Sequence, residues 1–300
     1  MMKPKITVIG SSNTDMICRV PSIPMPGETL MGKDFSTVQG GKGANQAVAA
    51  SRAGGDVTFI ACVGSDAFGQ QAIDAYQKDG INTSCIQKID DVATGVALIN
   101  VAHSGENSIS VAPGANAHLV PETIDKFRDV ILDSDIILLQ LEIPLETVYH
   151  VTSMASKANI PVVLNPAPAR EIDQATMKLL TLVTPNEHEA SLLSGCWPEA
   201  HDEKESALEI QKKGVKSVVV TLGSKGAFFL DNNGSGVVNV ANVKAIDTTA
   251  AGDTFNGYLV VELAKGKNLP ESIKLANKAA AISVTRRGAQ PSIPYIDELT

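Results

Sequence analysis

Residues 247–257, which read DTTAAGDTFNG, combine small residues with carboxylates just ahead of a predicted helix. The free N–H groups of Ala251, Gly252 and Asp253 at such a helix start can point at an anion, and the helix dipole adds to that attraction. A carboxylate beside such an anion hole can orient or deprotonate an attacking hydroxyl group. The competing interpretation is that Asp253 is only an N-terminal helix cap, a position where aspartate is common.

A second glycine-rich segment, residues 40–45, reads GGKGAN and precedes another predicted helix. Glycines let a backbone come close to a ligand, while Lys42 and Asn45 offer polar groups. The segment is not a Walker A motif, because Lys42 is followed by Gly43, and it is not the dinucleotide-binding GxGxxG. The competing interpretation is a flexible turn that leads into a helix.

Two further segments have polar residues at the ends of predicted strands. Residues 221–226 read TLGSKG, which can wrap a nucleotide or form a glycine-rich hairpin turn. Residues 184–189 read TPNEHE, and Asn186 and Glu189 share one face if this segment starts a helix. These two side chains are suited to phosphate and hydrated Mg²⁺, although a helix start with acidic first-turn residues explains them equally well.

The elements that must position these residues alternate between apolar runs and helical patterns. Runs that read as buried strands lie at residues 6–9, 57–63, 136–141, 160–164, 182–184 and 215–221. Helical patterns lie at residues 44–53, 68–78, 145–157, 175–180, 203–213, 254–265 and 270–286. This alternation predicts a mainly parallel sheet covered on both faces, with ligands beyond the carboxyl ends of its strands.

Two segments lack a helical period, at about residues 14–38 and 94–112. The second reads as a hairpin of residues 94–101 and 107–112 around the turn HSGE. We expect a small antiparallel sheet that projects from the main domain, either as a lid or as an ordinary surface excursion. Because no Pro/Gly/Ser-rich linker divides the chain, residues 1–300 are expected to form a single domain.

Composition and charge limit which molecules the chain can bind and where in the cell it is expected. The chain has 300 residues, 44% hydrophobic and 19% charged, with a net charge of −8, which disfavours a nucleic-acid partner. No apolar run approaches the roughly 18–20 residues that span a bilayer, and the N-terminal run is too short for a signal peptide. Four scattered cysteines without a CxxC pair are typical of reduced thiols, so a cytoplasmic protein is expected.

The order and spacing of the motifs resemble the ribokinase family of carbohydrate and nucleoside kinases over essentially the whole chain. The family's two signatures are similar to GGKGAN at 40–45 and DTTAAGD at 247–253. The family also matches five shorter segments, namely NTD at 13–15, LQLE at 139–142, LNPAPAR at 164–170, TPNE at 184–187 and GAQPS at 288–292. The resemblance implies a three-layer α/β/α domain with a mainly parallel central sheet and a small β-sheet lid, shared in a homodimer. It also implies phosphorylation of the 5-hydroxyl of D-ribose by ATP with Mg²⁺.

The same resemblance assigns roles to individual residues. Asp253 matches the catalytic base, and the anion hole matches Ala250, Ala251 and Gly252. Groups that hold the sugar match Asn13, Asp15, Gly41, Lys42, Gly43, Asn45, Glu142 and Asp253. The ATP site matches Asn186, Thr221, Leu222, Gly223, Ser224, Lys225, Gly226, Gly252 and Asn277, the last where the family often has histidine. A site for K⁺ or another monovalent cation matches Asp247, Thr249, Ser283, Arg286, Gly288 and Ser292.

Other functions compete with phosphorylation of ribose. A related kinase would act on deoxyribose, fructose or a nucleoside; Asn13 and Asp15 favour a small polyol, and the 4% aromatic content is low for a nucleobase site. A dinucleotide-dependent dehydrogenase is disfavoured because no GxGxxG follows Ile9. A non-catalytic sugar sensor is disfavoured by the presence of Asp253 and Gly252.

Overall fold

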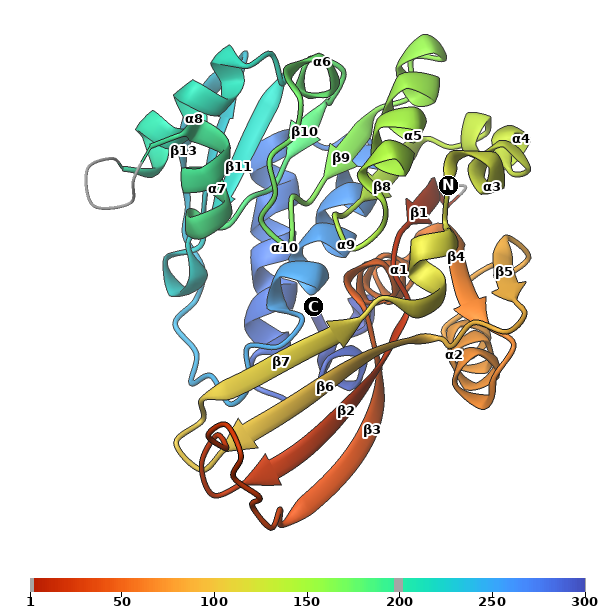
Figure 1. Cartoon of the computed structure of the whole chain (residues 1–300). Helices are drawn as coiled ribbons and strands as arrows, with labels where there is room; N and C mark the ends of the chain where they lie inside the picture. Colours follow the sequence, from red (N-terminus) through yellow and green to blue (C-terminus); the bar gives the residue numbers. More distant parts are fainter. Residues whose placement is uncertain (1–2, 197–201, 300) are drawn as a thin grey trace.

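The computed structural model of the chain describes residues 3–196 and 202–299, and its main sheet has nine strands (Figure 1). In spatial order these are β13 (Gly234–Val238), β12 (Ala227–Asp231), β11 (Ser217–Thr221), β10 (Leu182–Val183), β9 (Val162–Leu164), β8 (Ile136–Leu139), β1 (Lys5–Ile9), β4 (Asp56–Gly64) and β5 (Ile86–Ile89). Neighbouring strands from β11 to β5 are parallel, whereas β12 pairs antiparallel with β11 and with β13. The predicted mainly parallel sheet is therefore confirmed.

Helices cover both faces of this sheet because its strands are apolar on both faces. In β1, Ile6 and Val8 belong to one buried cluster and Ile9 belongs to the other, as the alternation of side chains along a strand requires. The first cluster includes α1 (Lys42–Arg52), α2 (Ala67–Lys78), α9 (Ala251–Ala264) and α10 (Leu269–Ser283). The second includes α3 (Pro121–Asp125), α4 (Arg128–Leu132), α5 (Leu145–Lys157), α6 (Gln174–Met177), α7 (Glu187–Ser194) and α8 (Glu203–Lys212). The expected three-layer α/β/α fold is confirmed.

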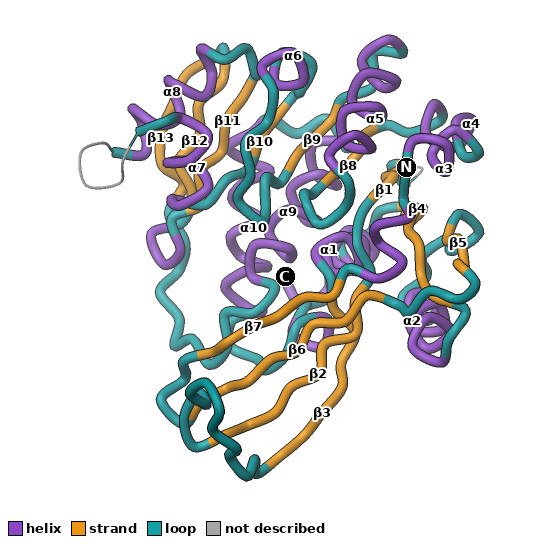
Figure 2. Tube along the Cα trace, in the orientation of Figure 1, coloured by secondary structure: helices purple, strands orange, loops and turns teal. Residues whose placement is uncertain are grey.

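A second sheet of four strands projects from the main sheet (Figure 1). Its order is β3 (Asp34–Gly40), β2 (Asn13–Val20), β6 (Gly95–Ala102) and β7 (Asn107–Ala112). The β2–β3 and β6–β7 pairs are antiparallel, but β2 and β6 are parallel. The predicted antiparallel pairing is confirmed for the two outer strand pairs but was wrong for the central pair, because β2 and β6 each begin a separate excursion and both run in the same direction. Figure 2 shows loops between this small sheet and the main sheet.

Most predicted elements agree with the structure, and the differences lie at their ends. The helix predicted from residue 254 begins at Ala251, and the helix predicted to reach residue 286 ends at Ser283. The short elements α3, α4, β5 and β13 were not predicted, whereas α7 and β12 correspond to the helix start and the hairpin that were the competing interpretations of residues 184–189 and 221–226. Each of these four unpredicted elements has five or fewer residues, too few for a periodic apolar pattern to stand out. Among the described residues, none of the helices has both the length and the apolar composition to cross a membrane.

Candidate active site

Asp253 lies in the first turn of α9 but does not cap that helix. The N-cap is Ala250, which has a left-handed backbone (φ 60°) and no capping side-chain hydrogen bond. The two carboxylate oxygens of Asp253 instead accept hydrogen bonds from α1: Oδ2 from Asn45 Nδ2 and Oδ1 from Gln46 Nε2, both at 2.9 Å. With 7% of its surface exposed, Asp253 is a buried carboxylate held by two amides. The helix-cap interpretation is therefore wrong.

The glycine-rich segment of residues 40–45 brings α1 against the loop that follows β1. Gly41 is the N-cap of α1 and has a φ of 88°, a conformation that favours glycine. A Cβ atom on Gly43 would lie 2.5 Å from the backbone nitrogen of Ser11, so only glycine fits there. These glycines allow a close approach between two backbones, and the first turn of α1 thereby delivers Lys42, Asn45 and Gln46 to Asp253.

The residues expected to hold a sugar surround this point. Glu142 Oε2 accepts hydrogen bonds from Ser11 Oγ at 2.6 Å and from the backbone nitrogen of Lys42 at 2.9 Å. Asn13 Oδ1 accepts from Asn116 Nδ2 at 2.7 Å. Asp15 lines a cavity of about 750 Å³ between the small sheet and residues 245–249 and 287–289.

A second cavity, of about 210 Å³, unites residues from all four motifs. It is lined by Lys42, Asn165, Ala167, Thr184, Asn186, Glu189, Thr221, Thr248, Ala250, Ala251, Gly252, Asp253 and Asn256. Asn165, Thr184 and Thr221 stand at the carboxyl ends of β9, β10 and β11, the edge where ligands of parallel sheets bind. Thr248 lines both cavities, so they are neighbours.

The charged side chains in this region shift one another's pKa values. The pKa of Asp15 is raised to about 7, mainly by burial and also by the nearby charges of Glu142 and Asp253. Burial also raises the pKa of Asp253, against the lowering effects of Lys42, Asn45 and Gln46. Burial alone would lower the pKa of Lys42, but Asp253 and Glu142 outweigh it and leave that pKa above its usual value. The site therefore holds the half-buried cation of Lys42 among several carboxylates.

The two segments expected to bind ATP, residues 184–189 and 221–226, also form the helix start and the hairpin turn that were their competing interpretations. Asn186 and Glu189 form a reciprocal capping box at the start of α7, with N–H···O distances of 2.9 and 2.8 Å, and still line the smaller cavity. Residues 222–226 form the turn between the antiparallel strands β11 and β12, where Gly223 and Gly226 have positive φ. Within the segment 221–226, Thr221 reaches the smaller cavity. The turn exposes Gly223, Ser224 and Lys225 and buries Leu222 and Gly226.

Asn277, expected beside adenine, is buried and joins α10 to the end of β13. Its Nδ2 atom donates a hydrogen bond to the carbonyl oxygen of Val238 at 2.8 Å. The amide therefore has a structural partner in the protein itself.

Residues expected to bind a monovalent cation are partly brought together. Asp247 Oδ2 accepts from the backbone nitrogen of Gly288 at 2.9 Å, and Oδ1 accepts from the nitrogen and hydroxyl of Thr249. Although burial raises the pKa of Asp247, these hydrogen bonds outweigh it and hold that pKa below its usual value. The side chain of Arg286 pairs with Glu298, and the buried hydroxyls of Ser283 and Ser292 donate to the carbonyls of Ala280 and Ala289.

Several amide side chains in the site were not predicted. Gln46 Nε2 also donates to Asn165 Oδ1 at 3.0 Å, while Gln46 Oε1 accepts from Gln140 Nε2 at 2.6 Å. Gln290 Nε2 donates to Asn45 Oδ1 at 3.2 Å. The signal for these residues was present, since each is a polar residue within or beside a matched motif, and Gln140 directly follows the apolar strand β8.

This arrangement suits the transfer of an anionic group to a hydroxyl. A buried carboxylate can accept a proton from a hydroxyl, while Lys42 and the N-terminus of α9 stabilise negative charge nearby. Among the described residues, no group of three or more histidine, cysteine, aspartate or glutamate side chains is arranged to hold a metal ion. A divalent cation here would need ligands beyond these side chains, and Mg²⁺ commonly takes them from substrate phosphates and water.

Comparison with known proteins relates this site to a family. Residues 3–296 match the model of the pfkB family of carbohydrate kinases. A ribokinase from Haemophilus influenzae is 45% identical, over 99% of this chain and 97% of its own length. A deoxyribokinase from Salmonella typhi is 38% identical, over 98% of this chain and 96% of its own length. The structure of Arabidopsis thaliana ribokinase complexed with ribose and ATP superposes with a TM-score of 0.93 at 31% identity, covering 99% of this chain and 98% of that one.

Proposed function

The chain belongs to the pfkB family of carbohydrate kinases, and we propose that it is a ribokinase, which transfers the γ-phosphoryl group of ATP to the 5-hydroxyl of D-ribose. The observation that carries this proposal is the position of Asp253: a buried carboxylate, held by two amides, beside Lys42 and the N-terminus of α9. The structure of a ribokinase with the same fold is of its complex with ribose and ATP, which supports the same pair of substrates here.

We place the two substrates in the two neighbouring cavities. Ribose lies toward Asp15, Asn13 and Asn45, beneath the small sheet, and its 5-hydroxyl faces Asp253. The phosphates of ATP lie in the smaller cavity beside Gly252, Asn186 and Thr221, with the nucleotide extending over the turn of residues 222–226. The transferring group then passes between the cavities near Thr248, which lines both.

In this mechanism each protein group has a defined role in the transfer. Asp253 orients the hydroxyl and takes its proton, while Lys42 and the N–H groups of Gly252 and Asp253 stabilise charge on the transferring phosphoryl group. Because the transition state of phosphoryl transfer is loose, positioning and charge stabilisation dominate. The small sheet acts as a lid that keeps water from competing as the acceptor.

Two metal ions belong to the proposal. Mg²⁺ would arrive with ATP and neutralise phosphate charge, and Asn186 and Glu189, which line the smaller cavity, would hold its water shell. K⁺ would lie beside the anion hole, held by Asp247 and by backbone carbonyls of Thr249, Ser283, Arg286 and Gly288, together with Ser292. The low pKa of Asp247 keeps this oxygen donor charged at neutral pH.

We also propose that two chains associate through the small sheet. On the face of this sheet that is turned away from the larger cavity, the apolar side chains of Phe35 and Leu98 are more than half exposed. Such a surface is typical of a contact with another protein, and a second copy of the chain would cover it. Sedimentation should give the mass of a dimer, and Leu98→Lys should shift the protein toward the monomer.

A second acceptor, 2-deoxyribose, is favoured by the similarity to a deoxyribokinase. Ribose remains the first choice, because Asn13, Asp15 and Asn45 converge on its hydroxyls, and each buried group left unpaired costs roughly 1–3 kcal/mol. ATP consumption over a panel of ribose, 2-deoxyribose, fructose and adenosine tests the proposal. Ribose should give the highest kcat/KM, and a panel in which fructose or adenosine is preferred would overturn it.

A further inference from the structure

Asn45 contacts Asp253 with one end of its amide and Gln290 with the other. Its Nδ2 atom donates to Asp253 Oδ2 at 2.9 Å, and its Oδ1 atom accepts from Gln290 Nε2 at 3.2 Å. Asn45 and Gln290 are 5% and 6% exposed, so bulk water does not compete for these hydrogen bonds.

The direction of the Asn45 amide decides its effect on Asp253. An amide has a donor end and an acceptor end, and an ionised carboxylate can only accept. With nitrogen toward Asp253 the contact is attractive, whereas with oxygen toward Asp253 it would be repulsive. Because the amide nitrogen of Gln290 can only donate, it binds the oxygen of Asn45 and keeps the nitrogen turned toward Asp253.

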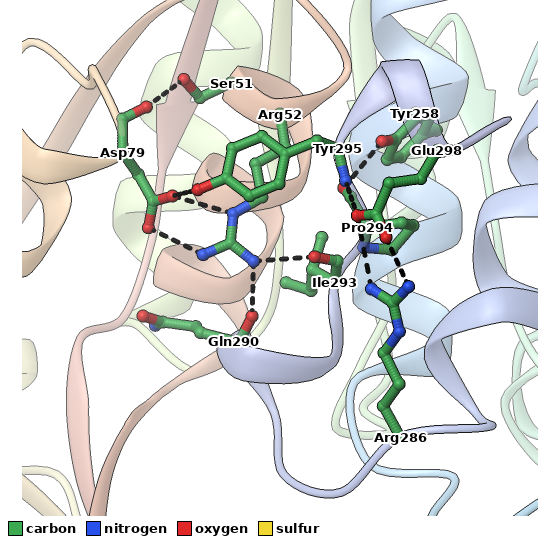
Figure 3. A network of polar contacts seen from close by, with 10 residues as sticks. All are labelled: Ser51, Arg52, Asp79, Tyr258, Arg286, Gln290, Ile293, Pro294, Tyr295 and Glu298. Carbon is green, nitrogen blue, oxygen red and sulfur yellow. Dashed lines mark hydrogen bonds and ion pairs between the residues drawn. The ribbon is translucent and has the colours of Figure 1, made fainter. Parts of the chain in front are cut away.

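Gln290 is itself anchored through its backbone. It begins the short helix η3 (Gln290–Ser292), and Arg52 of α1 donates from Nη1 to the carbonyls of Gln290 at 2.7 Å and Ile293 at 2.8 Å (Figure 3). The opposite edge of the same guanidinium pairs with Asp79, with Nε 2.8 Å from Oδ1 and Nη2 3.1 Å from Oδ2. Tyr295 stacks on the guanidinium at 4.8 Å and donates its hydroxyl to Asp79. Arg52 therefore holds residues 290–295 in one place on α1.

We propose that Gln290 is a positioning residue for the phosphoryl-transfer reaction, acting on Asp253 through the amide of Asn45. This inference rests on the proposed role of Asp253. Its consequence is that the segment of residues 290–295, which Arg52 anchors and which contains Ser292, reaches the catalytic base through two hydrogen bonds. A role limited to filling space would leave the properties of Asp253 unchanged.

The first test replaces Gln290 with methionine, which keeps the length of the side chain but cannot donate. Turnover should fall on the order of tenfold, because the Asn45 amide is then free to turn. The Asn45 hydrogen bond lowers the pKa of Asp253, so its loss should move the acid limb of the kcat–pH profile to higher pH. Lys42, Glu142, Asp15 and Glu189, the charged groups that act on Asp253, are unchanged in this variant.

Two further variants sharpen the test. Gln290→Glu presents an acceptor that should bind the nitrogen of Asn45 and turn its oxygen toward Asp253, so turnover should fall below that of Gln290→Met. Gln290→Asn keeps an amide in a shorter side chain that does not reach Asn45, and provides a second measurement if the methionine variant fails to fold. Gln77→Met, at an exposed glutamine of α2, is the matched control and should behave as the parent does.

A double-mutant cycle distinguishes an effect of Gln290 that passes through Asn45 from a general structural effect. In an Asn45→Ala background, Gln290→Met should cost little more turnover, because the residue that transmits its effect is gone. Equal losses in both backgrounds, or an acid limb that does not move in a folded Gln290 variant, would overturn the proposal. If the parent chain itself failed to phosphorylate ribose, the proposed function would be wrong instead.

Discussion

The side-chain nitrogen of Asn45 lies 2.9 Å from Oδ2 of Asp253, although 208 positions separate the two residues in the chain. The contact exists because α1 and α9 pack closely on one face of the main sheet. At Gly257 of α9, a Cβ atom would lie 2.4 Å from the side chain of Ala49 and 2.7 Å from the backbone of Ala50. The small residues of both helices therefore set the distance between the base and the amides that hold it.

Replacing Gly257 with alanine should separate these helices. Since the new Cβ atom meets backbone atoms of α1, the helix must shift, at a cost of typically 1–3 kcal/mol. Melting temperature and turnover should both fall, because the shift also lengthens the hydrogen bonds to Asp253. A variant with unchanged melting temperature and turnover would show that the helix spacing is not critical.

The pKa of Asp15 predicts how stability depends on pH. Its folded-state value of about 7 lies above the ordinary 3.8, so the folded protein binds the proton more tightly, and this group reduces stability progressively as pH rises between those values. Asp15→Asn carries no charge and removes that loss. The stability of the variant relative to the parent should therefore increase by about 1–3 kcal/mol from pH 5 to pH 8. Chemical denaturation without sugar measures this difference, and a pH-independent difference would contradict it.

A monovalent cation should activate the enzyme, because Asp247 and Gly288 are held together beside the anion hole. Activity in K⁺ should exceed activity in tetramethylammonium at matched ionic strength. Asp247→Asn, which weakens the proposed oxygen donor, should reduce the difference between the two salts. Equal activity of the parent in both salts would refute the cation site.

The Arg52–Asp79 pair should be strongly coupled, since each side chain is only 11% exposed. Arg52→Met leaves Asp79 as a buried charge without its partner and should cost roughly 3–5 kcal/mol of unfolding free energy. The double variant Arg52→Met, Asp79→Leu should recover part of this loss. Melting temperatures of the single and double variants provide the cycle, and strictly additive losses would show that the pair is not coupled.

Much of the fold could be predicted from local patterns. Buried strands such as β1 and β4 are continuous apolar runs, and their alternation with helical patterns indicated the parallel sheet. The parallel pairing of β2 with β6 was not predictable in this way, because it joins residues about eighty positions apart whose strands show no long-range signal. The ends of α9 and α10 were misjudged because small and polar residues there carry no apolar period.

The site was less predictable than the fold. The motifs identified Asp253, Lys42, Asn45 and Asn186, and the structure places these residues together or next to one another. The reason that Asp253 is not a helix cap lies in α1, far away in the sequence. Gln46, Gln140 and Gln290 lie within or beside the matched motifs, but their importance comes from hydrogen bonds across the fold, which a local pattern alone does not specify.

The most direct test of this account is the Asp253→Asn variant, with turnover and melting temperature measured on the same preparation. The change is isosteric and removes a buried charge that does not cap α9, so the fold should survive with a similar melting temperature. Turnover with ribose and ATP should fall on the order of 10²–10⁴-fold, as expected for the loss of a general base. A folded variant that keeps nearly normal turnover would contradict the proposal that Asp253 accepts the proton of the sugar hydroxyl.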